Sequence, residues 1–184
     1  MYKDLAFGPR NMGLSQDEID ERVREAASFV GVPESILEKS PLELSGGQKR
    51  RVAIAGVIAM RPRVLILDEP TAGLDPKGCE SILQNIIDYH EATRATVIIV
   101  SHSMETVARI AKRLVVFGSG NIVMDGGPKE VFADVDKLRS IGLDIPIVTE
   151  LSLRLRELGV DVPKSCHTIS QLRSAILDFK NKKK

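Results

Sequence analysis

Cysteine, tryptophan and long apolar runs are scarce in this sequence. It has two cysteines and no tryptophan among 184 residues. Cys79 and Cys166 are far apart and form no C-x-x-C pair, so we expect no structural disulfide, and a reducing compartment fits. The longest apolar run, residues 52–60, is too short for a membrane helix, which needs roughly 20 residues. The N-terminus also lacks the basic start and apolar core of a signal peptide.

An excess of charge of either sign is missing as well. The chain has 26 Lys and Arg against 25 Asp and Glu, so its net charge of +1 gives no indication of a nucleic-acid partner. The histidines do not cluster, and no spacing of cysteine and histidine suggests a metal site. We interpret the basic run at residues 180–184 as a solvated terminus, with phosphate or lipid binding as the alternative.

The sequence does contain enough apolar residues for one domain with a small appendage, since 43% of its residues are hydrophobic and 28% are charged. Ser15 and Glu18 have the spacing of a capping box and precede a helical apolar pattern up to about residue 30. Ser45 and Gln48 have the same spacing before an apolar run that ends near residue 60. Both patterns predict helices.

Two short apolar segments, RPRVLILD and ATVIIVSH, predict strands. Neither alternates between apolar and polar residues, which is typical of strands buried on both faces of a parallel sheet. Between them, Asp75 and Pro76 suit the N-cap and the first position of a helix. Strand, helix and strand together predict a βαβ unit and an α/β fold.

The remaining part of the chain becomes mainly helical. A helix, a hairpin with a Gly-Ser-Gly turn and a short helix are predicted over 104–112, 113–127 and 128–134. Amphipathic helices follow, and the last of them begins with the capping-box pair Thr168 and Gln171. We therefore predict one domain over 1–135 and a small α-rich C-terminal region over 136–184.

The segment LSGGQ at residues 44–48 has the features of an anion site. Gly46 and Gly47 let backbone N–H groups approach a ligand closely, and they begin a helix whose N-terminus favours anions. Ser45 adds a hydroxyl donor. The plainer interpretation is that Ser45 and Gln48 only cap the helix.

Polar side chains follow both predicted strands. Asp68 and Glu69 stand at the carboxyl end of the first, where open α/β sheets bind ligands. One carboxylate can hold Mg²⁺ with water and phosphate, and the other can orient or deprotonate a water. His102 follows the second strand and can donate a hydrogen bond to a phosphate. Each of these residues alone is more often structural, and Asp75 caps a helix in either case.

The order of these segments is specific. LSGGQ, VLILDE, GLDP and SH, within about residues 1–130, resemble the signature motif, Walker B strand, D-loop and H-loop of the ATP-binding subunits of ABC transporters. AFGPRNMGLS and GLDIPIVTELSLRLRELGVDVP further resemble the ATP-binding proteins of energy-coupling factor transporters. The resemblance implies part of a P-loop NTPase domain with a mainly parallel sheet. Its helical signature subdomain would cover about 10–60, and Walker B to the H-loop about 61–112.

The resemblance also implies ATP and Mg²⁺ as ligands and ATP hydrolysis as the reaction. The γ-phosphate of an ATP held by an opposite subunit would be contacted by Ser45, Gly46, Gly47 and Gln48.

The chain's own site would use the other motif residues. Asp68 would bind Mg²⁺ through water, and Glu69 would polarise the attacking water. His102 would contact the γ-phosphate, and Asp75 would lie at the interface between subunits.

Partners are implied in the same way. They are a second ATPase subunit of the same or another kind, a transmembrane coupling protein, and a membrane subunit that binds a vitamin or a metal ion. The protein would work as a peripheral subunit at the cytoplasmic face of the membrane. DEPTAGLDP favours the second member of an ATPase pair.

Several features of the family are not in the sequence. No glycine is followed by lysine, so there is no G-x-x-x-x-G-K-[ST] phosphate loop, and the adenine-stacking aromatic and Q-loop glutamine that would precede AFGP are also missing. We therefore expect this chain alone neither to bind ATP tightly nor to hydrolyse it, and we expect an exposed apolar edge on the second strand.

Three explanations stay open: a truncated or mis-started reading frame, a separately encoded first half, or a natural non-hydrolysing fragment that pairs with a complete ATPase. DNA-repair and ribosome-associated ATPases carry similar motifs. The coiled-coil heptads of the former and the tandem cassettes of the latter are not in this sequence.

Overall fold

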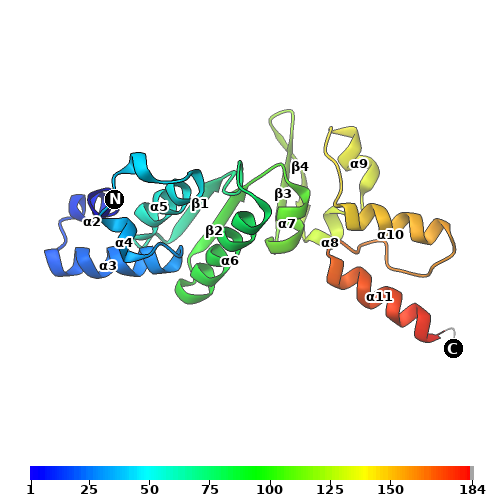
Figure 1. Cartoon of the computed structure of the whole chain (residues 1–184). Coiled ribbons are helices and arrows are strands. Elements are labelled where there is room, and N and C mark those ends of the chain that lie inside the picture. The colour runs from blue at the N-terminus through cyan, green and yellow to red at the C-terminus, as the bar shows by residue number, and fades with distance from the viewer. Residues whose placement is uncertain (183–184) are drawn as a thin grey trace. The chain divides into compact units, whose positions relative to one another are not determined.

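The chain divides between Val100 and Ser101 in the computed structural model, which describes residues 1–182 (Figure 1). The end of the basic run at 180–184 lies outside the described residues. The first unit contains α1 (Tyr2–Leu5), α2 (Phe7–Asn11), α3 (Gln16–Phe29), α4 (Glu34–Leu37), the 3-10 helix η1 (Pro41–Glu43), α5 (Gly46–Ile58), β1 (Val64–Asp68), α6 (Pro76–Thr93) and β2 (Thr96–Val100). The second contains α7 (Met104–Ile110), β3 (Leu114–Gly118), β4 (Asn121–Gly126), α8 (Pro128–Val131), α9 (Val135–Ser140), α10 (Ile147–Glu157) and α11 (Ile169–Lys182).

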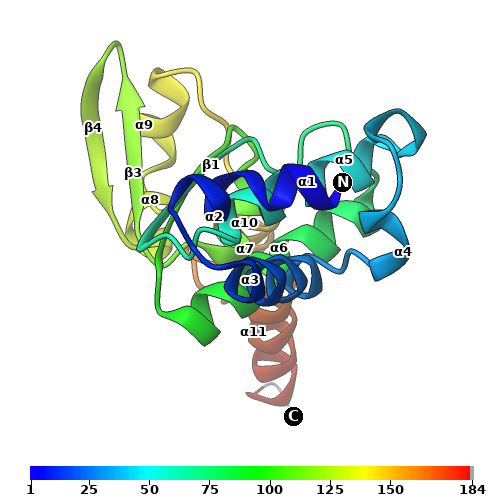
Figure 2. The ribbon, with the colours of Figure 1, turned by 90° about the vertical axis from the view of Figure 1, so that its left-hand side faces the viewer.

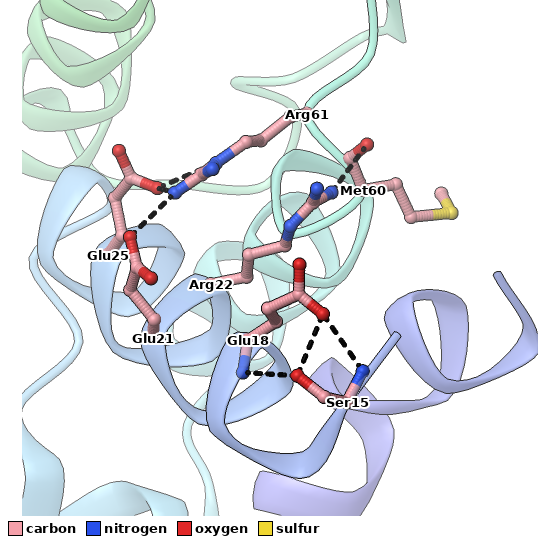
Figure 3. A network of polar contacts seen from close by, with 7 residues as sticks. All are labelled: Ser15, Glu18, Glu21, Arg22, Glu25, Met60 and Arg61. Carbon is pink, nitrogen blue, oxygen red and sulfur yellow. Dashed lines mark hydrogen bonds and ion pairs between the residues drawn. The ribbon is translucent and has the colours of Figure 1, made fainter. Parts of the chain in front are cut away.

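Helix α3 begins at the predicted capping box. The Ser15 hydroxyl accepts the Glu18 N–H at 3.4 Å, and the Glu18 carboxylate accepts the Ser15 N–H at 3.0 Å (Figure 3). Its apolar face, which includes Ile19 and Val23, is buried in the core of the first unit. Helices α3 and α5 pack against each other there (Figure 2).

Arg61, in the loop between α5 and β1, ties this loop to α3. Its guanidinium contacts Glu21 at 3.2 Å and Glu25 at 2.7 Å, and Arg22 of α3 donates to the Met60 carbonyl (Figure 3). The Arg61 side chain is 45% exposed, so each ion pair contributes less than about 1 kcal/mol to stability. Apolar packing between α3 and α5 therefore dominates.

Strands β1 and β2 are parallel, as predicted, with Val64 opposite Thr96 and Asp68 opposite Val100. Leu65, only 1% exposed, faces the core together with residues of α6. The other face carries exposed apolar side chains: Val64, Ile66, Ile98 and Val100.

The prediction that both faces of these strands are buried is therefore wrong for this chain, because its helices cover one face. Within the described residues β2 pairs with β1 alone, and the exposure of its other edge stays a prediction.

The second unit contains the predicted hairpin, in which β3 and β4 are antiparallel. Its turn uses Ser119 and Gly120, with φ angles of 48° and 78°, and glycine tolerates the second without strain. Helix α11 begins with half of the predicted box: Thr168 accepts the Gln171 N–H, but the Gln171 side chain accepts the His167 N–H instead.

The boundary that we predict after residue 135 does not coincide with the division at Val100. One cluster of the second unit packs Ala108, Phe132, Leu138 and Ile145 together across residue 135. The boundary concerns the family's domains and stays a prediction. Among residues 1–182, every helix is too short or too polar to span a bilayer.

Candidate functional site

The signature segment, residues 44–48, is shaped by its own side chains. The Ser45 hydroxyl accepts the Gln48 N–H at 3.3 Å, and the Gln48 side chain accepts the Ser45 N–H at 2.9 Å. The predicted capping box is therefore confirmed, and the plainer role of Ser45 and Gln48 is real. A cap does not remove the anion-binding capacity of the helix start, because the first N–H groups of a helix have no acceptor within it. These belong to Gly46 and Gly47.

Both glycines leave room for a ligand. A Cβ at Gly46 would meet no atom within 4 Å, and one at Gly47 would lie 3.5 Å from Leu74. The backbone at Gly46 is thus open to approach. The Gly47 contact places the signature segment beside the GLDP segment, which contains Leu74.

Asp75 caps α6, as predicted. Its carboxylate accepts the Gly78 N–H at 3.1 Å, and Pro76 fills the first helical position. Its expected place between subunits stays a prediction.

The Walker B turn, residues 68–72, follows β1 directly. Asp68 is exposed at the end of the strand. The Glu69 N–H donates to the Val100 carbonyl at 2.9 Å, and the Glu69 carbonyl accepts the Ala72 N–H at 3.1 Å. Pro70 is fully buried behind them. Both predicted carboxylates therefore stand at the carboxyl end of the parallel strands.

Glu69 has a backbone conformation that the sequence did not indicate. Its φ of 45° lies in the left-handed region, which costs a residue with a Cβ about 1–2 kcal/mol. Such strain persists only where the surroundings over-determine the backbone, and it gathers at functional sites.

Arg50 of α5 supplies part of that constraint. Its Nε donates to the Pro70 carbonyl at 3.1 Å, and its Nη2 donates to the Asp68 carbonyl at 3.3 Å. The helix that begins at the signature segment is thus bonded to the Walker B turn. Sequence reasoning missed Arg50, because nothing in a local pattern indicates a contact between a helix and a distant turn.

His102 belongs to the second unit and is exposed in the short segment before α7. Its neighbour Ser103 caps α7 by accepting the Thr106 N–H at 3.2 Å. The structure describes the two units separately, so the phosphate contact of His102 stays a prediction.

The carboxylates suit Mg²⁺ bound together with phosphate. Within residues 1–182 no group of three or more Asp, Glu, His or Cys side chains gathers into an all-protein metal site. Mg²⁺ is usually bound by one or two carboxylates with waters and substrate phosphates, and Asp68 with Glu69 offers that donor set.

The comparisons with known proteins agree with these motifs. Residues 3–72 match the family model described as ABC transporter. The energy-coupling factor transporter ATP-binding protein EcfA2 of Caldanaerobacter subterraneus subsp. tengcongensis is 51% identical over 97% of this chain and 63% of its own length. The protein of the same name from Clostridium perfringens is 55% identical over 96% of this chain and 62% of its own length.

Solved structures of ATP-binding cassette proteins are also similar to this chain. The structure of cbiO1 from Clostridium perfringens, part of the ABC transporter complex cbiONQ, is 40% identical, with a TM-score of 0.68 over 86% of this chain and 59% of its own. The ATP-binding cassette MJ0796, solved as a dimer bound to ADP and Pi, is 30% identical, with a TM-score of 0.55 over 62% of this chain and 49% of its own.

Residues 3–72 therefore match the ABC transporter family, and the chain is similar to the ATP-binding proteins of such transporters. Within that class it is related over nearly its whole length to the ATP-binding proteins of energy-coupling factor transporters. It spans 62% to 63% of the length of the two relatives named above.

Proposed function

We propose that this chain is the signature- and Walker B-bearing part of an ATP-hydrolysing subunit of an energy-coupling factor transporter. The observation that carries the proposal is the joining, in one unit, of the open N-terminus of α5 and the carboxylates after β1. Identity of 51% to EcfA2 over 97% of the chain supports the transporter type.

The chemistry follows from where the donors and carboxylates lie. Phosphoryl transfer depends mainly on positioning and on stabilising negative charge. The start of α5 offers backbone N–H groups to the γ-phosphate of an ATP on an opposite subunit, through Ser45, Gly46, Gly47 and Gln48. Such a composite site needs a pair of subunits, with Asp75 near their interface. The dimeric structure of MJ0796 supports pairing.

In its own site the chain contributes carboxylates and a histidine. Asp68 would hold Mg²⁺, which neutralises charge on the phosphates when bound. Glu69 accepts a hydrogen bond from the attacking water and takes its proton. His102 donates to the γ-phosphate.

The remaining partners are proposed from the relatives. They are a transmembrane coupling protein and a membrane subunit that binds a vitamin or a metal ion, with this chain peripheral at the cytoplasmic face. The description of cbiO1 as part of the cbiONQ complex supports membrane partners.

A second function is a non-hydrolysing module. The 184 residues contain a complete signature segment but no G-x-x-x-x-G-K-[ST] loop. Such a chain can present α5 to the nucleotide of a complete ATPase.

The test joins to this chain the part of Clostridium perfringens EcfA2 that lies outside the matched region. We expect the hybrid to hydrolyse ATP and Glu69→Gln to lower kcat at least about 100-fold, because a general base contributes that much. A hybrid that binds no nucleotide would contradict the proposal.

The unmodified chain is assayed alone and mixed with complete EcfA2. Hydrolysis by the chain alone that Glu69→Gln abolishes would overturn our expectation of inactivity. An increase in EcfA2 activity that resists Glu69→Gln but is lost in Ser45→Arg would identify the non-hydrolysing module.

A further inference from the structure

Glu69 is held by hydrogen bonds on both sides of its backbone. Its own N–H and carbonyl bond to Val100 and Ala72. The carbonyls of the residues before and after it, Asp68 and Pro70, both accept hydrogen bonds from the Arg50 guanidinium. A single side chain thus restrains the 68–69 peptide, which leads into the left-handed residue, and the 70–71 peptide, which follows Pro70.

An arginine suits this task for geometric reasons. The guanidinium is planar, and its N–H groups diverge in a fixed fork, so that it can bridge two carbonyls at once. A lysine ammonium carries the same charge but has no such fork. Arg50 is half-buried, so water competes less for its donors than on an open surface.

We propose that Arg50 is a positioning residue that keeps Glu69 in its left-handed conformation and aims its carboxylate. That the direction of the Glu69 carboxylate matters for hydrolysis rests on the proposed function. The effect of Arg50 on the Glu69 backbone does not. Arg50 lies on the first turns of α5, two residues after Gln48. A phosphate that pulls on the start of α5 therefore acts on the same side chain that holds Glu69, which couples the signature segment to the Walker B turn of one chain.

Hydrogen exchange on the 184-residue chain tests the structural effect. Arg50→Ala removes both bonds, and we expect the Glu69 and Ala72 amides to exchange about tenfold faster, the effect of losing roughly one net hydrogen bond. Arg50→Lys should fall between the wild type and Arg50→Ala, since it keeps the charge and loses the fork. Amides in the middle of β2 should exchange as in the wild type.

Arg51→Ala is the matched control. Arg51 is the next residue of α5 and donates to the Gly31 carbonyl at 3.5 Å and the Ser81 hydroxyl at 3.2 Å, far from the Walker B turn in the sequence. We expect it to leave exchange at Glu69 and Ala72 unchanged. Equal exchange in Arg50→Ala and the wild type would overturn the proposal, and so would equal acceleration by Arg50→Ala and Arg51→Ala. If Arg50→Ala does not fold, Arg50→Lys against Arg51→Lys gives the same comparison.

The hybrid described above tests the consequence for hydrolysis. We expect Arg50→Ala to lower kcat about 10- to 100-fold with little change in KM for ATP, because misplacing a catalytic group by about 1 Å costs up to that much. Arg50→Lys should recover part of the loss. Faster exchange in a chain whose hybrid never hydrolyses ATP would support positioning and contradict the proposed function. A hybrid that hydrolyses ATP equally well with and without Arg50→Ala would support the proposed function and contradict positioning by Arg50.

Discussion

The signature segment and the Walker B turn belong to the same unit, but they keep their shapes in different ways. Ser45 and Gln48 bond to each other's backbone, so the signature segment is fixed by residues three positions apart. The Walker B turn bonds to Val100 at the end of β2 and to Arg50 of α5. One segment is locally determined, and the other needs the assembled unit.

The two segments also differ in how closely their functional groups must be positioned. A helix start needs only its cap and open N–H groups to contact an anion. A carboxylate that must meet one water needs a closely fixed direction, and the strained Glu69 backbone supplies it. Damage to packing should therefore disturb the Walker B turn and spare the signature segment.

The largest expected effect comes from the core side of β1. Leu65→Ala removes a side chain that is 1% exposed, and we expect it to lower the free energy of unfolding of the first unit by about 2–5 kcal/mol. Ile66→Ala, on the neighbouring residue that is 64% exposed, should change it by less than about 0.5 kcal/mol.

Urea unfolding, followed by tyrosine fluorescence, measures the free energy of unfolding of Leu65→Ala and Ile66→Ala. The chain has two tyrosines and no tryptophan, and both Tyr2 and Tyr89 lie in the first unit. An Ile66→Ala cost as large as that of Leu65→Ala would mean that the exposed face of the sheet is covered in solution.

A smaller effect is expected at the signature segment. Ser45→Ala removes the N-cap and should lower the free energy of unfolding by about 1 kcal/mol, while Ser45→Asp should keep it within about 0.5 kcal/mol because aspartate caps helices well. The same urea measurement applies. The link through Arg50 predicts that loss of this cap also speeds amide exchange at Glu69, and unchanged exchange there would contradict the coupling of the two segments.

Ser45→Asp also separates capping from phosphate contact. The aspartate preserves the helix but places a negative charge where a γ-phosphate would lie. If the chain stimulates complete EcfA2, we expect Ser45→Asp to abolish that stimulation. A stable Ser45→Asp chain that still stimulates would show that Ser45 is a cap alone.

The smallest effect concerns pH and compares two local boxes. Hydrogen bonds from the Ser15 side chain and backbone lower the pKa of Glu18 below its usual range, whereas Gln48 in the equivalent box cannot titrate. The Glu18 contribution to stability is present above the ordinary carboxyl pKa and is lost as pH falls through the lowered pKa. We expect Glu18→Gln to flatten the acid limb of an unfolding curve slightly, with Gln48→Glu steepening it.

Much of the fold was predictable because it is local. The capping boxes at Ser15 and Ser45, the cap at Asp75 and the hairpin turn each follow from residues a few positions apart. The parallel pairing of β1 and β2 follows from the pattern of strand, helix and strand. The expectation that the strands are buried on both faces failed, because burial depends on which elements the chain brings to the sheet. Helices α1, α2 and α9 had no clear pattern and were missed.

The sequence by itself determined the motif order and the starts of α3, α5 and α6, since a hydroxyl or carboxylate reaches the N–H three residues on wherever the chain turns into a helix. That is why the roles of Ser45 and Asp75 as caps needed no tertiary information. Only the tertiary structure decided that Glu69 is left-handed and that Arg50 holds the carbonyls on either side of it. Those contacts join residues far apart in the chain, and they form when β1 has paired with β2 and α5 has packed on its unit.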